Sequence, residues 1–197
     1  MITAIGDVMR EAYRRGWITT RDGNISLCRA NSKIMYITPS GVRKSIIHPE
    51  HIVKVRFTKD GLSITDGVEP SGELHMHAML QMNNRGHRAI VHLHPTNIIS
   101  AMYAGFDLQI IAAEFPEVSR YTKVGPSVPV LPATSKELAE STFKAMTDSK
   151  DKKVIYDIVG QGNHGVCSAG ANPWDAFEHI ERLDHICEIV LKSGIAP

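Results

Sequence analysis

The sequence has 197 residues, of which 43% are hydrophobic and 22% charged, so it is long enough for one domain, residues 1–197, with a substantial core. Its 22 basic and 21 acidic residues give a net charge of +1, which argues against nucleic acid and membranes as partners. No apolar run approaches the roughly 18 residues of a membrane span. The three cysteines lack a CxxC spacing, which is typical of a protein of the reducing cytoplasm.

The first third of the chain predicts a helix followed by short strands. Apolar residues recur at helical spacing from Ile5 to Tyr13, so we expect an amphipathic helix over residues 2–15. The segments that follow are rich in β-branched residues and are separated by turn residues, with a hairpin turn at 59–61. The predicted strands are NISLCR, KIMYIT, HIVKVRF and LSIT.

Helices and single strands alternate in the rest of the chain. Ser71 can cap the start of a helix that Gly86 ends, and Pro173 lies in the first turn of a long helix over 172–192. Because strands joined by hairpins precede the alternating part, the pattern favours a largely antiparallel sheet covered by helices. The other predicted helices are TNIISAMYAG and SKELAESTFKAM, and the other predicted strands are RAIVHLH, SVPVLP and KVIYDIVGQ.

Two histidines one residue apart end the apolar strand RAIVHLH. Side chains on a strand repeat every two residues, so His92 and His94 project from the same face. One cation could then accept both imidazoles at the roughly 2.0–2.1 Å of zinc–nitrogen bonds. Without a third ligand, two partly buried histidines bonded to backbone are the alternative.

A second pair, His75 and His77, lies on a predicted helix. Two residues correspond to about 200° around a helix of 3.6 residues per turn, so these side chains face nearly opposite ways and cannot chelate one metal together. His77 lies four residues after Glu73, on the same helical face. Its predicted role is a supporting hydrogen bond to Glu73 or to the core.

His164 is the best candidate for a third ligand. It follows a predicted buried strand and lies between Gly162 and Gly165, which allow the backbone to approach a neighbouring group closely. Cys167, in a β-like apolar segment, is more typical of an inert core thiol. The remaining histidines occur in turn sequences or in the last helix, where exposure or packing is the default interpretation: His48, His51, His87, His179 and His185.

Five short motifs occur together in this chain: GNIS (23–26), ITPSG (37–41), EPSGE (69–73), VHLHP (91–95) and NHG (163–165). Their order and spacing resemble the class II aldolase/adducin family, and in particular its sugar-phosphate aldolase branch, which includes L-fuculose-1-phosphate aldolase. The resemblance spans nearly the whole chain. It implies an α/β (α+β-like) fold, a three-layer α/β/α sandwich with a central, mostly antiparallel sheet.

The resemblance also implies a metal-dependent lyase. One divalent cation per chain, most often Zn²⁺ with Mn²⁺, Co²⁺ or Fe²⁺ as alternatives, would be held by His92, His94 and His164. Glu73 would be the catalytic acid/base, and also a metal ligand when substrate is absent. The residues implied for the substrate phosphate are Asn24, Thr38, Ser40, Gly41, Ser71 and Gly72.

The implied reaction cleaves a ketose 1-phosphate, of the deoxy- or methylthio-pentulose or fuculose type, to dihydroxyacetone phosphate and an aldehyde. It proceeds through a metal-stabilised enediolate, and Glu73 moves the proton to and from carbon. Small-residue turns whose amides can face an anion agree with a phosphate site. Lys44 either adds charge near the phosphate or is a surface lysine. The resemblance further implies a small phosphorylated sugar as substrate and a homotetramer as the assembly.

Two positions depart from the fuculose-type pattern. The stretch VPVLPATSKEL places Val130 or a neighbour where those aldolases carry a proton-donating tyrosine, and Tyr121 lies outside the matched motif. Gly72 replaces a serine of the usual PSSE. These differences leave open a sugar-acid-phosphate decarboxylase or a methylthioribulose-phosphate dehydratase. An adducin-like interaction module is the non-catalytic alternative, which the intact set of Glu73 and three histidines disfavours.

Overall fold

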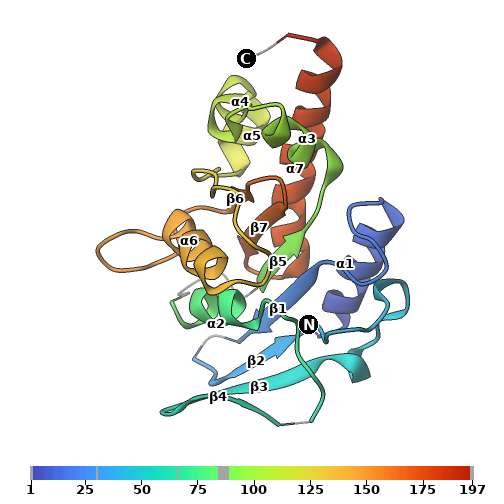
Figure 1. Cartoon of the computed structure of the whole chain (residues 1–197), viewed down its shortest axis with the longest axis vertical. Helices are drawn as coiled ribbons and strands as arrows, with labels where there is room; N and C mark the ends of the chain where they lie inside the picture. The colour runs from blue at the N-terminus through green and yellow to red at the C-terminus, as the bar shows by residue number, and fades with distance from the viewer. Residues whose placement is uncertain (1, 30, 66, 84–88, 196–197) are drawn as a thin grey trace.

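One sheet organises the chain, of which the computed structural model describes residues 2–29, 31–65, 67–83 and 89–195. Within these ranges seven strands pair in the order β4-β3-β2-β1-β5-β7-β6, and every neighbouring pair is antiparallel (Figure 1). The predicted antiparallel sheet is therefore confirmed. The strands are β1 (Asn24–Cys28), β2 (Ile34–Ile37), β3 (Val53–Thr58), β4 (Gly61–Ile64), β5 (Ala89–Leu93), β6 (Ile158–Gln161) and β7 (Gly165–Gly170).

Helices cover the sheet, and the longest of them begins as the sequence predicts. The side chain of Asn172 accepts hydrogen bonds from the amides of Trp174 and Asp175, and Pro173 occupies the first turn. None of the helices in the described ranges is long and apolar enough to cross a membrane. The helices are α1 (Ile2–Arg14), α2 (Leu74–Met82), α3 (Thr96–Tyr103), α4 (Leu108–Glu114), α5 (Pro116–Tyr121), α6 (Lys136–Met146) and α7 (Pro173–Ser193), with the 3₁₀-helices η1 (Lys44–Ile46) and η2 (Pro49–His51).

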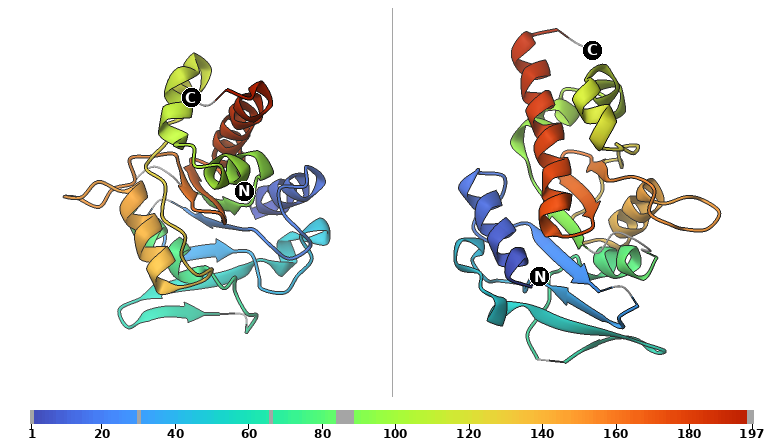
Figure 2. Two further views of the ribbon diagram at one scale, coloured as in Figure 1. Left: turned by 45° about the horizontal axis from the view of Figure 1, so that its top comes forward. Right: turned by 180° about the vertical axis from the view of Figure 1, so that it is seen from behind.

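The helices form one layer on each face of the sheet. On one face α1, α3 and α7 share the largest apolar core with Val91 and Leu93 of β5. On the other face α2 and α6 pack together over Ile90 (Figure 2). Successive residues of β5 thus enter opposite cores, as a strand buried on both faces requires. The predicted three-layer α/β/α sandwich is confirmed.

Some predicted elements differ from those observed. SVPVLP is not a strand: only Val128 makes an isolated bridge, to Gln161, because the two prolines of this segment cannot donate to a ladder. The strand predicted as KVIYDIVGQ is confined to β6. Helices α4 and α5 were not predicted, because at 7 and 6 residues they are too short for apolar periodicity to be recognised.

The start of α2 also differs from the prediction. Its cap residue is Glu73, whereas the hydroxyl oxygen of Ser71 accepts a hydrogen bond from the Glu73 amide at 3.3 Å. Ser71 therefore caps the turn that precedes the helix, and the first helical residue is Leu74. The predicted end of this helix at Gly86 lies outside the described residues.

The central position of β5 brings distant motifs together. β5 pairs with β1 on one side, where Asn24 lies opposite His92, and with β7 on the other. Gly165 opens β7 at a place where an added Cβ would lie 2.5 Å from the carbonyl oxygen of Leu93. Glycine is therefore required for the close approach of β7 to β5, and this approach positions the adjacent His164.

Candidate metal centre and active site

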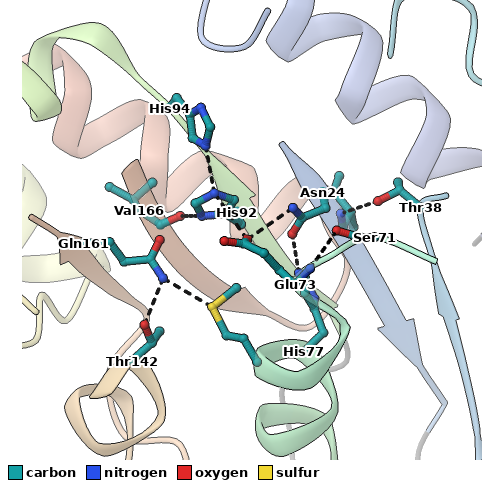
Figure 3. Close-up of polar contacts among 12 residues, drawn as sticks. Asn24, Thr38, Ser71, Glu73, His77, His92, His94, Thr142, Gln161 and Val166 are labelled. Atoms are coloured by element: carbon teal, nitrogen blue, oxygen red, sulfur yellow. Dashed lines mark hydrogen bonds and ion pairs between the residues drawn. The ribbon is translucent and has the colours of Figure 1, made fainter. Parts of the chain in front are cut away.

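Three histidines converge at the end of β5. The Nε2 atoms of His92 and His94 are 2.8 Å apart, as the two-residue period of the strand predicts (Figure 3). The His164 ring, from the turn between β6 and β7, lies with its centroid 4.9 Å from each of the other two. One ligand atom from each of the three residues lies within 4.8 Å of the others, so together they could hold a metal ion.

The hydrogen bonding and charge of these rings fit a divalent metal. His92 Nδ1 lies 2.9 Å from the carbonyl oxygen of Val166, which only accepts, so Nδ1 carries the hydrogen and Nε2 presents its lone pair to the cluster. His164 Nδ1 is buried and has no hydrogen-bond partner in the described part of the chain. Burial, then the proximity of neighbouring histidines, lowers the pKa of His92 and of His94 to about 3. Neutral imidazoles are the form that zinc and similar ions bind.

Glu73 lies beside this cluster at the start of α2. Its side chain is 7% exposed, and its Oε2 atom is 3.4 Å from His92 Nε2. The same oxygen accepts a hydrogen bond of 3.2 Å from the amide group of Asn24. The position suits both proton transfer to a molecule held by the histidines and direct ligation.

An open pocket of about 220 Å³ contains nearly all the predicted site residues. Thr38 is the exception among the predicted residues that the structure describes: it is buried, and its hydroxyl oxygen accepts a hydrogen bond from the Ile25 amide at 3.2 Å. Its position indicates support for the β1–β2 pair. The predicted residues that line the pocket are Asn24, Ser40, Gly41, Ser71, Gly72, Glu73, His92, His94 and His164.

The two small-residue turns of the pocket are joined by their serine amides. The Ser40 amide donates to the Glu69 carbonyl at 2.9 Å, and the Ser71 amide donates to the Thr38 carbonyl at 3.0 Å. Among the hydrogen bonds of the described residues, none uses the amide of Gly41 or of Gly72. The donors available to an anion here are therefore the glycine amides and the serine hydroxyls, not all the amides of the turns.

The geometry has a counterpart in known proteins. The profile of the family described as "Class II Aldolase and Adducin N-terminal domain" matches residues 3–191. The chain belongs to this family. A sugar-phosphate aldolase structure from Thermotoga maritima superposes with a TM-score of 0.79 at 24% identity, covering 100% of this chain and 97% of that one, which shows the shared fold.

The curated relatives are lyases with different sugar-phosphate substrates. An L-fuculose phosphate aldolase from Methanococcus maripaludis is 27% identical over 90% of this chain and 88% of its own length. A 3-oxo-tetronate 4-phosphate decarboxylase from Escherichia coli K12 is 26% identical over 94% and 83%, respectively. A 5-deoxy-D-ribulose 1-phosphate aldolase from Bacillus thuringiensis is 28% identical over 87% and 75%. The chain is therefore an enzyme of the class II aldolase family, whose members use a divalent metal, and its similarity does not single out one substrate.

Three charged residues outside the predicted site set also line the pocket of this class II aldolase, and two of them, Arg21 and Asp22, were not considered from the sequence. Arg21 and Asp22 precede the GNIS motif, and no pattern distinguishes them from an ordinary surface pair. Lys44 is not a surface lysine: it is 2% exposed, and its ammonium donates to the carbonyl oxygens of Pro39 and Val42, each at 3.3 Å. Burial lowers its pKa, and Asp22 opposes this shift. Lys44 thus stabilises the turn that contains Ser40 through hydrogen bonds to its carbonyl oxygens, and it adds positive charge to the pocket.

The Gly72 departure from the family pattern has a local steric explanation. An added Cβ at Gly72 would lie 3.2 Å from the Cγ2 atom of Thr134, another pocket residue that was not predicted. Thr134 has a φ of 61°, a conformation that β-branched residues rarely adopt. A threonine held in this conformation fills the space beside Gly72. Glycine therefore suits position 72 in this chain.

The helix histidines differ from the strand histidines as predicted. His75 is exposed, whereas His77 is fully buried against β1. His77 Nε2 lies 2.5 Å from Asn24 Oδ1, and His77 Nδ1 lies 2.7 Å from Ser26 Oγ. The predicted supporting hydrogen bond is present. His77 bonds to Asn24, and the amide group of Asn24 in turn donates to Glu73.

Proposed function

We propose that this class II aldolase cleaves a ketose 1-phosphate, of the deoxypentulose, methylthiopentulose or fuculose type, to dihydroxyacetone phosphate and an aldehyde. The observation that carries the proposal is the position of the Glu73 carboxylate, 3.4 Å from His92 Nε2 in a pocket that also contains glycine- and serine-rich turns. A metal site, an acid/base and an anion site within one pocket are the three parts that such a cleavage needs.

His92, His94 and His164 would hold the divalent cation, and zinc is an ion that a set of three imidazole ligands suits. When bound, the cation supplies Lewis-acid stabilisation of the negative charge that develops on the substrate oxygens. Burial keeps the His92 and His94 rings neutral near pH 7 and therefore competent as ligands.

The chain itself would bind the phosphate and move the proton. The amides of Gly41 and Gly72 have no hydrogen-bond partner among the described residues, and the Lys44 ammonium adds positive charge to the same pocket. Glu73 would return a proton to the carbon of the three-carbon fragment in cleavage, and remove it in the reverse direction. Asn24 holds this carboxylate through the bond to Oε2.

The decisive experiment joins metal analysis to an assay of aldol synthesis. We expect purified protein to carry about one divalent metal per chain. The metal-loaded protein should form aldol products from dihydroxyacetone phosphate and at least one of a panel of short aldehydes, and chelation should abolish product formation. A folded protein that shows neither bound metal nor metal-dependent activity contradicts the proposal.

A decarboxylase acting on a keto-acid phosphate is the second candidate. Two points favour it: the similarity to the decarboxylase from Escherichia coli matches that to the aldolases, and the family resemblance places Val130 or a neighbour, not a tyrosine, at the position of the proton-donating tyrosine of fuculose-type aldolases. Val130 is 65% exposed, and its aliphatic side chain can neither take a proton from the hydroxyl that becomes the aldehyde nor donate one in the reverse direction. Release of CO₂ from a 3-keto-acid 4-phosphate, without an aldol product from any aldehyde, would replace the first candidate by the second.

A further inference from the structure

A row of five buried polar side chains connects the interior of the molecule to the Glu73 carboxylate. Gln81 Nε2 lies 3.0 Å from Ser26 Oγ, and Ser26 Oγ lies 2.7 Å from His77 Nδ1. His77 Nε2 lies 2.5 Å from Asn24 Oδ1, and Asn24 Nδ2 lies 3.2 Å from Glu73 Oε2 (Figure 3). Each of the five residues is at most 7% exposed. The row alternates between the two elements: Gln81 and His77 belong to α2, Ser26 and Asn24 belong to β1, and Glu73 is the cap residue of α2.

The donors of this row all point toward Glu73. A carboxylate only accepts, so Asn24 must present its NH₂ group to Glu73 and its carbonyl oxygen to His77. His77 Nε2 therefore carries a hydrogen and donates it to Asn24. His77 Nδ1 is then a bare lone pair that accepts from the hydroxyl of Ser26, and the Ser26 oxygen accepts from the amide group of Gln81.

We infer that His77 is a positioning residue for Glu73. As the neutral Nε2–H tautomer, selected by Ser26 and Gln81, it turns the Asn24 amide so that its NH₂ group holds the Glu73 carboxylate beside the histidine cluster. This inference rests on the proposed role of Glu73 as acid/base. It also gives Asn24 a contact with Glu73 in addition to the phosphate role that the family resemblance implies.

Burial supports the neutral ring, because the fully desolvated environment lowers the pKa of His77 to about 3. The Asn24 contact also has a specific consequence. An Asn24 amide turned the other way would place its carbonyl oxygen against the carboxylate, and the resulting repulsion would drive Glu73 away from its position. Removing outer partners of this kind typically lowers activity about 10–100-fold.

Two substitutions of His77 separate positioning from simple packing. In His77→Gln the side-chain amide nitrogen can reach the place of Nε2 and still donate to Asn24. The shorter side chain of His77→Asn reaches only the place of Nδ1, so it contacts Ser26 and leaves Asn24 without its donor. We expect kcat to fall about 10–100-fold in His77→Asn, with KM within about twofold and metal content unchanged, and to be largely retained in His77→Gln. His75→Gln, on the exposed face of α2, is the matched control.

The second readout does not depend on activity. Nitrogen NMR of protein labelled at the histidine rings should show His77 as the neutral Nε2–H tautomer between pH 6 and 8, assigned by its loss in His77→Gln. Ser26→Ala, which removes the hydroxyl that selects the tautomer, should allow the Nδ1–H form to appear and should lower kcat as His77→Asn does. If His77→Asn fails to fold, Ser26→Ala provides the kinetic comparison.

Two results would overturn the inference: a wild-type His77 that is charged or Nδ1-protonated, or equal kcat values in His77→Asn and His77→Gln. A protein without lyase activity that still shows the Nε2–H tautomer would contradict the proposed function and leave the hydrogen-bond row established. The two failures are therefore distinguishable.

Discussion

The two histidine pairs of this chain have the same spacing in sequence, but one pair lies on a strand and the other on a helix. On β5, His92 and His94 point the same way, and their Nε2 atoms lie 2.8 Å apart. On α2, His75 is exposed while His77 is buried against Asn24 and Ser26. The period of the backbone, two residues in a strand and 3.6 in a helix, decides whether two imidazoles can reach one cation.

The difference also indicates that β5 and α2 contribute different chemical groups to the site. In the proposed site the strand would supply nitrogen ligands for the metal, whereas the helix supplies a carboxylate and the buried hydrogen bonds that hold it. The two contributions meet at Glu73, which lies 3.4 Å from His92 on one side and is bonded to Asn24 on the other. Substitutions on the strand should therefore affect metal content, and those on the helix should affect proton transfer.

The largest effect is expected from His94→Ala. Loss of one of three nitrogen ligands should remove nearly all bound metal and lower activity by about 10³-fold or more, since Lewis-acid stabilisation contributes several kcal/mol. His75→Ala should retain the metal content and activity of the wild type, because His75 is exposed and is not part of the three-histidine cluster. Mass spectrometry after gel filtration measures the metal content of both variants, and the aldol assay measures their activity. Equal metal content in the two variants would contradict the distinction between the pairs.

Glu73→Gln should separate the two contributions directly. The amide keeps the size of the side chain but cannot accept a proton, so we expect kcat to fall about 10²–10⁴-fold. Metal content should stay near that of the wild type, because the three histidines are intact. Solvent-deuterium exchange into dihydroxyacetone phosphate measures the proton step alone. Unchanged exchange in this variant would mean that another group moves the proton.

Periodicity and glycine placement were sufficient to predict the strand pair and the position of His164. The pattern of hairpins also predicted the antiparallel sheet, since local alternation determines which face of a strand is buried. The three-histidine cluster could thus be predicted from sequence because its geometry follows from one strand and one turn. Assignment of Glu73 additionally required the resemblance to a family, since a glutamate at a helix start has no unique meaning alone.

Contacts between distant segments could not be predicted in the same way. The buried position of Lys44 depends on how the turn after β2 folds back, and the space beside Gly72 depends on Thr134, 62 positions further along the chain by their numbers. SVPVLP has apolar residues of strand type, yet its prolines prevent pairing. Each of these outcomes is set by tertiary packing, which local propensity does not contain.

A smaller effect is expected in the acid stability of metal-free protein. The folded pKa of His77 is about 3, below the ordinary value of about 6.5, so between these values the unfolded chain binds more protons. The free energy of unfolding should therefore fall as pH drops below about 6.5. The contribution of His77 is about 1 kcal/mol between pH 7.5 and pH 5.5.

Urea unfolding of His77→Gln at the two pH values tests this sign and size. Glutamine does not titrate, so the loss of stability between pH 7.5 and pH 5.5 should be about 1 kcal/mol smaller than in the wild type. His75→Gln is the control, because an exposed histidine should leave the pH dependence as it is. An identical pH dependence in wild type and His77→Gln would show that His77 titrates normally in the folded protein.

The smallest effect concerns the shape of the pocket where it meets α2. A serine at position 72 would place its Cβ about 3.2 Å from Thr134 Cγ2, so Gly72→Ser should cost about 1 kcal/mol of stability, the low end of overpacking effects. In a Thr134→Gly background the same change should cost less, because the contact is gone and glycine tolerates the φ of 61°. A double-mutant cycle by urea unfolding should give a coupling of about 0.5 kcal/mol. Strict additivity would mean that the backbone at 72 shifts away from Thr134, and the glycine would then need an explanation in substrate binding rather than in packing.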